Sequence, residues 1–245
     1  PDSSTSRGLG DVYKRQAVAD FLPEAAQALA NKSGAPVMGG AALINSPDID
    51  AVVIGTPTDT HYELIQKAAK AGKAIFCEKP VDMSVERIKE CQTAVEQAGV
   101  TFLTAFNRRF DPNFAAVQSR LAAGEIGTVE LLTILSRDPS PPPLSYIRSS
   151  GGIFRDMMIH DLDLARFMLG EDPVLVMATG SCLVDPDIGA LAMSTLLRLC
   201  CKPPQGKSVR FPIRVAPPMA MTNVSKCMAV RACCGLIICW KALLR

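Results

Sequence analysis

A lysine, an aspartate and a histidine are the residues of this 245-residue chain whose positions best suit catalysis. Lys79 stands in the tripeptide Glu78-Lys79-Pro80, which directly follows an apolar run typical of a buried strand. If that strand belongs to a parallel sheet, Lys79 points into the crevice where such sheets bind ligands. The tripeptide alone fits a surface lysine in a turn equally well.

Asp156 and His160 are four positions apart, which predicts that they share one face of a single helix. An aspartate can fix the tautomer of an imidazole and raise its basicity, and such an imidazole suits a general base near neutral pH. A helical histidine is also common as a purely structural residue. The neighbouring Asp161 and Asp163 are expected to face elsewhere and to cap or solvate the helix.

The elements that must position these residues alternate between apolar strands and amphipathic helices from Ala17 onward. The run 51–55 is apolar throughout, which is typical of a parallel strand buried on both faces. This alternation indicates an α/β fold, in which a parallel sheet is connected by right-handed crossovers. Strands are predicted at 17–19, 51–55, 74–77 and 100–106, and helices at 25–34, 60–72 and 84–98.

Asp20 closes the first predicted strand of this sheet. An acid at such a strand end accepts hydrogen bonds from the ribose hydroxyls of a dinucleotide and repels a 2′-phosphate, which favours NAD over NADP. The same aspartate would serve equally well as the N-cap of the helix that follows. A smaller α+β domain is expected after residue 107, with strands near 128–136 and 174–182.

Charge is distributed unevenly along the chain. The first 187 residues hold 17 basic and 24 acidic side chains, whereas the last 58 hold nine basic side chains and none that is acidic. We therefore expect residues 191–245 to be a tail translated in a shifted reading frame. The alternative is a basic module that binds nucleic acid or an anionic membrane, but even spacing of the charges and scarce aromatics disfavour both partners.

Cysteine spacing and the length of apolar runs indicate whether the chain binds a metal and where in the cell it is located. No two cysteines form a Cys-x-x-Cys pair and no histidine follows His160, so no metal site is predicted. No signal peptide opens the chain, which predicts a cytoplasmic protein with free thiols. The apolar run 233–240 is too short to span a bilayer.

Four ordered blocks lie within roughly residues 17–190, at 56–61, 72–80, 107–111 and 151–161. Together they resemble the Gfo/Idh/MocA oxidoreductase family, and in particular its inositol-oxidising branch. This resemblance implies an N-terminally truncated Rossmann-type sheet followed by an incomplete α+β substrate domain. It divides the chain into a linker-like segment 1–16, a partial dinucleotide-binding domain 17–107, a partial substrate and oligomerisation domain 108–190, and the tail.

The resemblance also implies a role for each matching residue. Lys79 would bind the substrate hydroxyl, His160 would take its proton as a hydride leaves for the nicotinamide, and Asp156 would tune His160. The bond before Pro80 would be cis. The cofactor-binding residues would be Asp20, Thr56, Pro57, His61, Glu78 and Lys79, and the substrate-binding residues Asn107, Arg108, Asp156 and His160.

The expected activity is therefore the NAD-dependent oxidation of a secondary hydroxyl of myo-inositol, or of a related cyclic polyol or sugar, to the ketone. A polyol is the expected small-molecule partner, and the parent protein is expected to be a homo-oligomer, either a dimer or a tetramer. The alternative is an inactive, truncated fragment, because no Gly-rich phosphate loop precedes Ala17.

Overall fold

The computed structural model describes residues 16–127, 129, 131–138, 142–182, 185–191, 196–202, 208–215 and 235–237. The chain divides into two compact units, which comprise residues 1–105 and 106–245. Each unit has its own sheet and its own apolar core.

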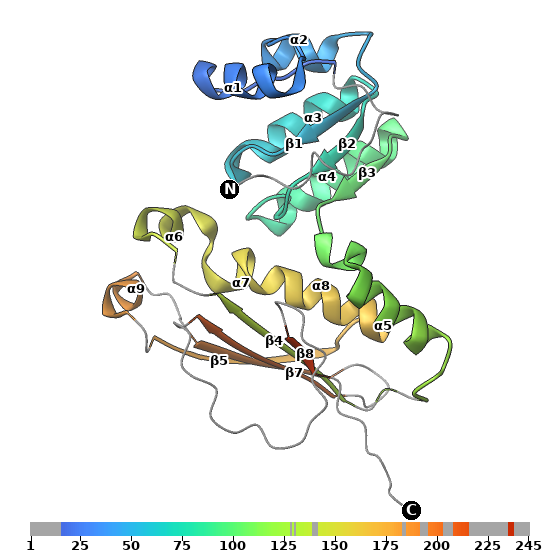
Figure 1. The fold of residues 1–245 in the computed structure, drawn as a ribbon, viewed down its shortest axis with the longest axis vertical. Coiled ribbons are helices and arrows are strands. Elements are labelled where there is room, and N and C mark those ends of the chain that lie inside the picture. Colours follow the sequence, from blue (N-terminus) through green and yellow to red (C-terminus); the bar gives the residue numbers. More distant parts are fainter. Residues whose placement is uncertain are drawn as a thin grey trace, which may run out of the picture. The chain divides into compact units, whose positions relative to one another are not determined.

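The first unit contains a parallel three-stranded sheet in the order β1–β2–β3, with helices packed against it (Figure 1). This arrangement confirms the predicted α/β fold. The strands are β1 (Ala51–Ile54), β2 (Ala74–Cys77) and β3 (Phe102–Thr104). The helices are α1 (Pro23–Ser33), α2 (Gly40–Asn45), the 3₁₀ turn η2 (Thr58–Thr60), α3 (His61–Lys70) and α4 (Val85–Ala98).

The predicted strand at 17–19 is reduced to a single parallel bridge between Val18 and Val37. Val18 is buried, and with Ala30 and Ala35 it forms a small apolar cluster. The helix predicted after it is confirmed as α1, which ends at Gly34 in the left-handed region, with φ 70°.

The core of the first unit lies between the sheet and helices α3 and α4. Ile65 and Ala68 of α3 are fully enclosed, and they pack in one cluster with Val52 and Ile54 of β1. The prediction that β1 is buried on both faces is wrong, because Val53 is 72% exposed. Burial alternates along the strand, since within the described part of the chain nothing covers the face that carries Val53.

The second unit contains a mixed five-stranded sheet in the order β5–β6–β7–β4–β8. The β4–β7 pair is parallel and the other pairs are antiparallel. Its strands are β4 (Leu131–Asp138), β5 (Leu175–Ser181), β6 (Leu196–Lys202), β7 (Ser208–Val215) and β8 (Gly235–Ile237). Its helices are η3 (Asn107–Phe110), α5 (Pro112–Ala122), α6 (Leu144–Ser150), α7 (Gly152–Asp156), α8 (Met158–Leu169) and α9 (Pro186–Ala190).

Helices α5 and α8 cover one face of this sheet (Figure 1). Phe114 of α5, Ile134 of β4 and Leu164 of α8 are buried together in the core of the unit. Strands β6 and β7 lie beyond residue 190, within the segment for which the sequence predicts a shifted frame, and both pair into the sheet. No helix in the described ranges is long and apolar enough to cross a membrane.

Candidate functional site

The carboxyl ends of β1 and β2 bring several predicted site residues to one edge of the first sheet. Ile54 pairs with Cys77 at the last position of the ladder, so the segments that follow both strands leave the sheet side by side. Thr56 and Pro57 follow β1 and are exposed, whereas Glu78 and Lys79 follow β2 and are half-buried. This is the edge at which parallel sheets bind ligands.

Backbone hydrogen bonds fix the turn that carries Lys79. The amide of Glu78 donates to the carbonyl oxygen of Ile54 at 2.9 Å, and the Lys79 amide donates to the Glu78 carboxylate at 3.2 Å. The peptide bond between Lys79 and Pro80 is cis, which confirms that prediction. The turn is therefore attached to both neighbouring strands, since Ala105 also donates to the carbonyl oxygen of Cys77, the last residue of β2, at 2.9 Å.

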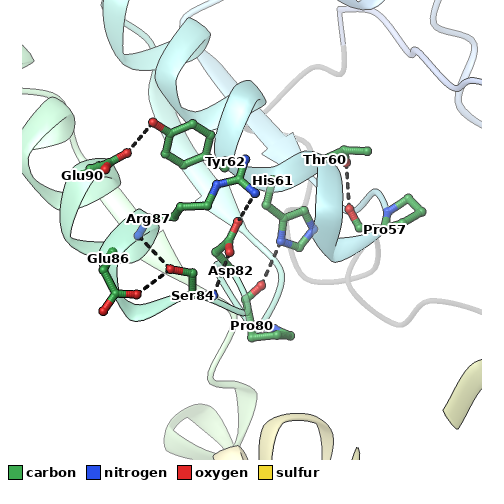
Figure 2. A network of polar contacts seen from close by, with 10 residues as sticks. All are labelled: Pro57, Thr60, His61, Tyr62, Pro80, Asp82, Ser84, Glu86, Arg87 and Glu90. Carbon is green, nitrogen blue, oxygen red and sulfur yellow. Dashed lines mark hydrogen bonds and ion pairs between the residues drawn. The ribbon is translucent and has the colours of Figure 1, made fainter. Parts of the chain in front are cut away.

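His61 lies at the start of α3 and only 1% of its surface is exposed. Its Nδ1 atom is 2.9 Å from the carbonyl oxygen of Pro80, and its Nε2 atom is 2.8 Å from the carbonyl oxygen of Thr56. Figure 2 shows the ring directed at Pro80 from α3. Both ring nitrogens are thus used inside the unit, and neither is available to hydrogen-bond a ligand.

Asp20 follows the Val18 bridge, and its side chain is exposed. Its Oδ1 atom accepts a hydrogen bond from the Leu22 amide at 2.8 Å, just before α1 begins. The alternative prediction that Asp20 is the N-cap of this helix is wrong, because Leu22 holds that position and the Asp20 side chain instead closes a turn just before it. The exposed carboxylate also remains accessible to a ligand.

Asp156 and His160 belong to two consecutive helices, so the prediction of a single helix is wrong. Asp156 ends α7, and Met157 separates it from α8. The amide of His160 donates to the Met157 carbonyl at 3.2 Å, a three-residue spacing that is tighter than an α-turn. Because the helix is interrupted there, a separation of four residues does not by itself place the two side chains on one helical face.

Asp156 has a partner that the sequence did not reveal. The hydroxyl of Tyr146, on α6, donates to Asp156 Oδ1 at 2.9 Å. Burial, together with the hydrogen bond to this carboxylate, raises the pKa of Tyr146 to about 12. The Tyr146 hydroxyl therefore keeps its proton near neutral pH and remains a hydrogen-bond donor to Asp156. No periodicity links residues ten positions apart on different helices, so no sequence pattern could have indicated this pair.

Arg108 and Arg109 form ion pairs within the second unit. Arg108 pairs with the fully buried Asp161, which also accepts a hydrogen bond from the Ser136 hydroxyl at 2.6 Å. Arg109 holds Asp163 through two bonds, Nε to Oδ2 at 2.8 Å and Nη2 to Oδ1 at 2.6 Å. The prediction that Asp161 and Asp163 cap or solvate the helix is wrong, because both are buried and paired.

The ion pair of Arg108 limits how accessible this predicted substrate-binding residue is to a ligand. The side chain of Arg108 is only 14% exposed, and its guanidinium is paired with Asp161. Asn107 begins η3 and is exposed. Of the two residues predicted to border the polyol, Asn107 is thus the more accessible one.

Two family models match the chain. Residues 5–106 match the Gfo/Idh/MocA oxidoreductase family, described as an NAD-binding Rossmann fold, and residues 114–199 match the C-terminal domain of the same family. The first match extends into the segment that the sequence set aside as linker-like, and the second extends past residue 190.

Individual relatives agree with the family models. The chain is 56% identical over 173 residues to an inositol 2-dehydrogenase of Rhizobium meliloti, a match that covers 71% of this chain and 52% of that protein. A myo-inositol dehydrogenase structure from Corynebacterium glutamicum matches with a TM-score of 0.77 at 40% identity, over 81% of this chain and 60% of that one. A scyllo-inositol dehydrogenase structure from Lactobacillus casei, with bound NAD(H) and scyllo-inositol, matches with a TM-score of 0.75 at 27% identity, over 83% and 62%. The chain thus spans about half the length of the curated relative.

Proposed function

Because the chain belongs to the Gfo/Idh/MocA oxidoreductase family, we propose that it oxidises a ring hydroxyl of myo-inositol, or of a related cyclic polyol, to the ketone with NAD. The observation that carries this proposal is the turn Glu78-Lys79-Pro80 at the carboxyl end of β2. The sequence similarity to inositol dehydrogenases supports the choice of substrate class.

The first unit has side chains that fit a dinucleotide. The exposed carboxylate of Asp20 suits the two hydroxyls of an adenosine ribose and repels a 2′-phosphate. Thr56 and Pro57 are exposed at the carboxyl edge of the sheet, where they can line the nicotinamide half together with Glu78. When bound, NAD supplies the hydride acceptor.

Three side chains manage the hydroxyl proton in this proposal. His160 accepts the proton as general base, and Asp156 orients the imidazole. Lys79 donates a hydrogen bond to the substrate oxygen, which stabilises the negative charge that develops on it. The hydrogen bond from Tyr146 holds one oxygen of Asp156 and so limits the rotation of its carboxylate.

We further propose that the protein is a cytoplasmic homo-oligomer. Apolar side chains around β5 support an oligomer, because Leu175, Val176 and Met177 are all more than half exposed in this chain. Cys77, Cys91 and Cys182 are free thiols, which is in keeping with a reducing compartment.

The experiment is an assay of NADH absorbance with the purified 245-residue chain and NAD. Myo-inositol, scyllo-inositol and glucose are each tested as the substrate. We expect turnover that Lys79→Ala and His160→Ala each reduce at least about 100-fold, as loss of a positioned acid or base does. Lys70→Ala, an exposed lysine at the end of α3, is the matched control and should leave turnover unchanged. A folded chain that binds NADH and turns over none of the three substrates would overturn the proposal and favour the inactive alternative.

A further inference from the structure

A short series of hydrogen bonds holds the hydroxyl group of Thr56, which follows β1 at the carboxyl edge of the first sheet. The hydroxyl oxygens of Thr56 and Thr60 are 2.6 Å apart, and Thr60 Oγ1 donates to the carbonyl oxygen of Pro57 at 2.7 Å. Figure 2 shows the bond between Thr60 and Pro57. Both distances are normal for hydrogen bonds between oxygen atoms. Three groups of one turn thus form a continuous series that begins at Thr56.

The direction of each hydrogen bond follows from the hydrogens that the groups possess. A carbonyl oxygen can only accept, so the single hydroxyl hydrogen of Thr60 is directed at Pro57. Thr60 has no second hydrogen to give to Thr56, and the hydrogen between the two oxygens therefore belongs to Thr56. Because the only hydroxyl hydrogen of Thr56 is used inside the turn, its oxygen can only accept further hydrogen bonds.

The backbone around Thr56 is held independently of its hydroxyl. The carbonyl oxygen of Thr56 lies 2.8 Å from Nε2 of the buried His61, and the Thr60 amide donates to the Pro57 carbonyl at 3.0 Å. Thr60 stands at the N-cap position of α3, yet among the described residues its side chain accepts no hydrogen bond from an amide of that helix. The Thr60 hydroxyl therefore serves the turn in front of α3, and its removal leaves the bonds of the helix in place.

We propose that Thr60 is a positioning residue that orients the Thr56 hydroxyl as an acceptor for a hydrogen-bond donor of the dinucleotide. Thr56 is exposed at the edge where parallel sheets bind ligands, so a ligand can reach the remaining lone pairs of its oxygen. The nicotinamide half of NAD has two kinds of donor, the carboxamide N–H groups and the ribose hydroxyls. The identity of the ligand rests on the proposed function, whereas the series of hydrogen bonds does not.

The first test compares NADH affinity across substitutions that keep the shape of threonine. Thr56→Val removes the acceptor and should weaken NADH binding about fivefold, the usual effect of one uncharged hydrogen bond. Thr60→Val should weaken it about threefold, because the Thr56 hydroxyl is then free to rotate, and Thr60→Ser should keep the affinity. Thr93→Val is the matched control: it removes an exposed bond to the Lys89 carbonyl, at 3.0 Å, and should leave NADH affinity unchanged.

A combined variant tests whether Thr60 acts through Thr56. If it does, the chain with both Thr56→Val and Thr60→Val binds NADH as weakly as Thr56→Val alone, since the hydroxyl that Thr60 orients is already missing. Independent roles would instead multiply the two losses to about 15-fold. That product, or an unchanged NADH affinity in Thr60→Val, would overturn the positioning role.

A cofactor analogue tells which donor Thr56 accepts. In reduced 3-acetylpyridine adenine dinucleotide a methyl group replaces the carboxamide nitrogen, so the carboxamide donor is absent. If Thr56 accepts from the carboxamide, Thr56→Val weakens the binding of NADH but not that of the analogue. If it accepts from the ribose, Thr56→Val weakens the binding of both equally. Unchanged affinity for both nucleotides would overturn the acceptor role.

Failure of the proposed function is recognised separately. If the unsubstituted chain binds no NADH, the proposed function fails, and amide hydrogen exchange still tests the series of hydrogen bonds. The Thr60 amide should exchange about fivefold faster in Thr60→Val than in Thr60→Ser, because the turn loses the hydroxyl bond to Pro57 in the valine variant alone. Equal exchange rates in the two variants would contradict the series itself.

Discussion

The guanidinium of Arg108 and the carboxylate of Asp161 form an ion pair inside the second unit, with the aspartate fully buried. Arg108 lies in η3, Asp161 in α8, and Ser136 of β4 donates its hydroxyl to the same aspartate. This pair therefore ties the start of the second unit to its main helix and to its sheet.

We expect Arg108→Leu to lower the free energy of unfolding by about 3–5 kcal/mol, because it leaves a buried carboxylate without its counter-charge. Urea unfolding followed by circular dichroism measures the change. Arg120→Leu is the matched control: the pair of Arg120 with Glu125, at 3.8 Å, is exposed, and its loss should cost less than about 1 kcal/mol. Equal effects of the two substitutions would contradict the importance of the buried pair.

Lys73 gives a second test of a buried charge, this time in the first unit. It is only 9% exposed, and its Nζ atom donates to the carbonyl oxygens of Ser46 and Ile49 at 2.7 and 2.6 Å. Lys73→Met should destabilise the chain by about 1–3 kcal/mol, because both carbonyls lose a charged donor. Lys67→Met, at an exposed position of α3, should have little effect under the same urea titration. Similar unfolding midpoints for the two variants would contradict this role.

Local patterns predicted most of the first unit. Apolar runs of strand length identified β1 and β2, and the amphipathic segments between the predicted strands identified α1, α3 and α4. These signals depend on neighbours in the sequence, so one sequence is enough to read them. The exposure of Val53 depends instead on what covers the strand, and a continuous apolar run cannot report that.

No pattern in the sequence could predict the polar contacts of the candidate site. Arg108 and Asp161 are 53 positions apart, and Tyr146 and Asp156 lie on different helices. Such pairs form only once the tertiary fold exists, and no period of 2 or 3.6 residues connects them. The break at Met157 was missed for a related reason, because the spacing of Asp156 and His160 suits a continuous helix.

The buried thiols predict a loss of stability at alkaline pH. The pKa values of Cys77 and Cys91 are raised by burial from 9 to about 12 and about 11. The unfolded chain therefore releases thiol protons above pH 9 while the folded chain still holds them. Stability is complete below pH 9 and falls as the pH rises toward 11, by roughly 1 kcal/mol per pH unit for each thiol. Urea titrations between pH 8 and 11 measure this, and a free energy of unfolding that is constant over that range would contradict it.

The same burial predicts an order of thiol reactivity. Cys77 is fully enclosed, whereas Cys182 is partly exposed. At pH 8 we expect iodoacetamide to modify Cys182 at least about tenfold faster than Cys77, because the thiolate is the reactive form. Peptide mapping by mass spectrometry separates the two sites. Modification at equal rates in urea would show that the difference belongs to the fold, and equal rates in the native chain would contradict the prediction.

The hydrogen bond between Tyr146 and Asp156 predicts an effect on both catalysis and alkaline stability. Under the proposed function, Tyr146→Phe should reduce kcat about tenfold. The reason is that Asp156, which orients the His160 imidazole in this proposal, loses the hydrogen-bond donor that holds its carboxylate. The pKa of Tyr146 is raised from 10 to about 12, so its contribution to stability is complete below pH 10 and is lost as the pH rises to 12. The unsubstituted chain should therefore be more stable than Tyr146→Phe at pH 8, and the difference should shrink by pH 11. Tyr62→Phe removes an exposed hydrogen bond of comparable geometry and should leave kcat unchanged. A Tyr146→Phe chain with unchanged kcat would show that this phenol does not help to position Asp156.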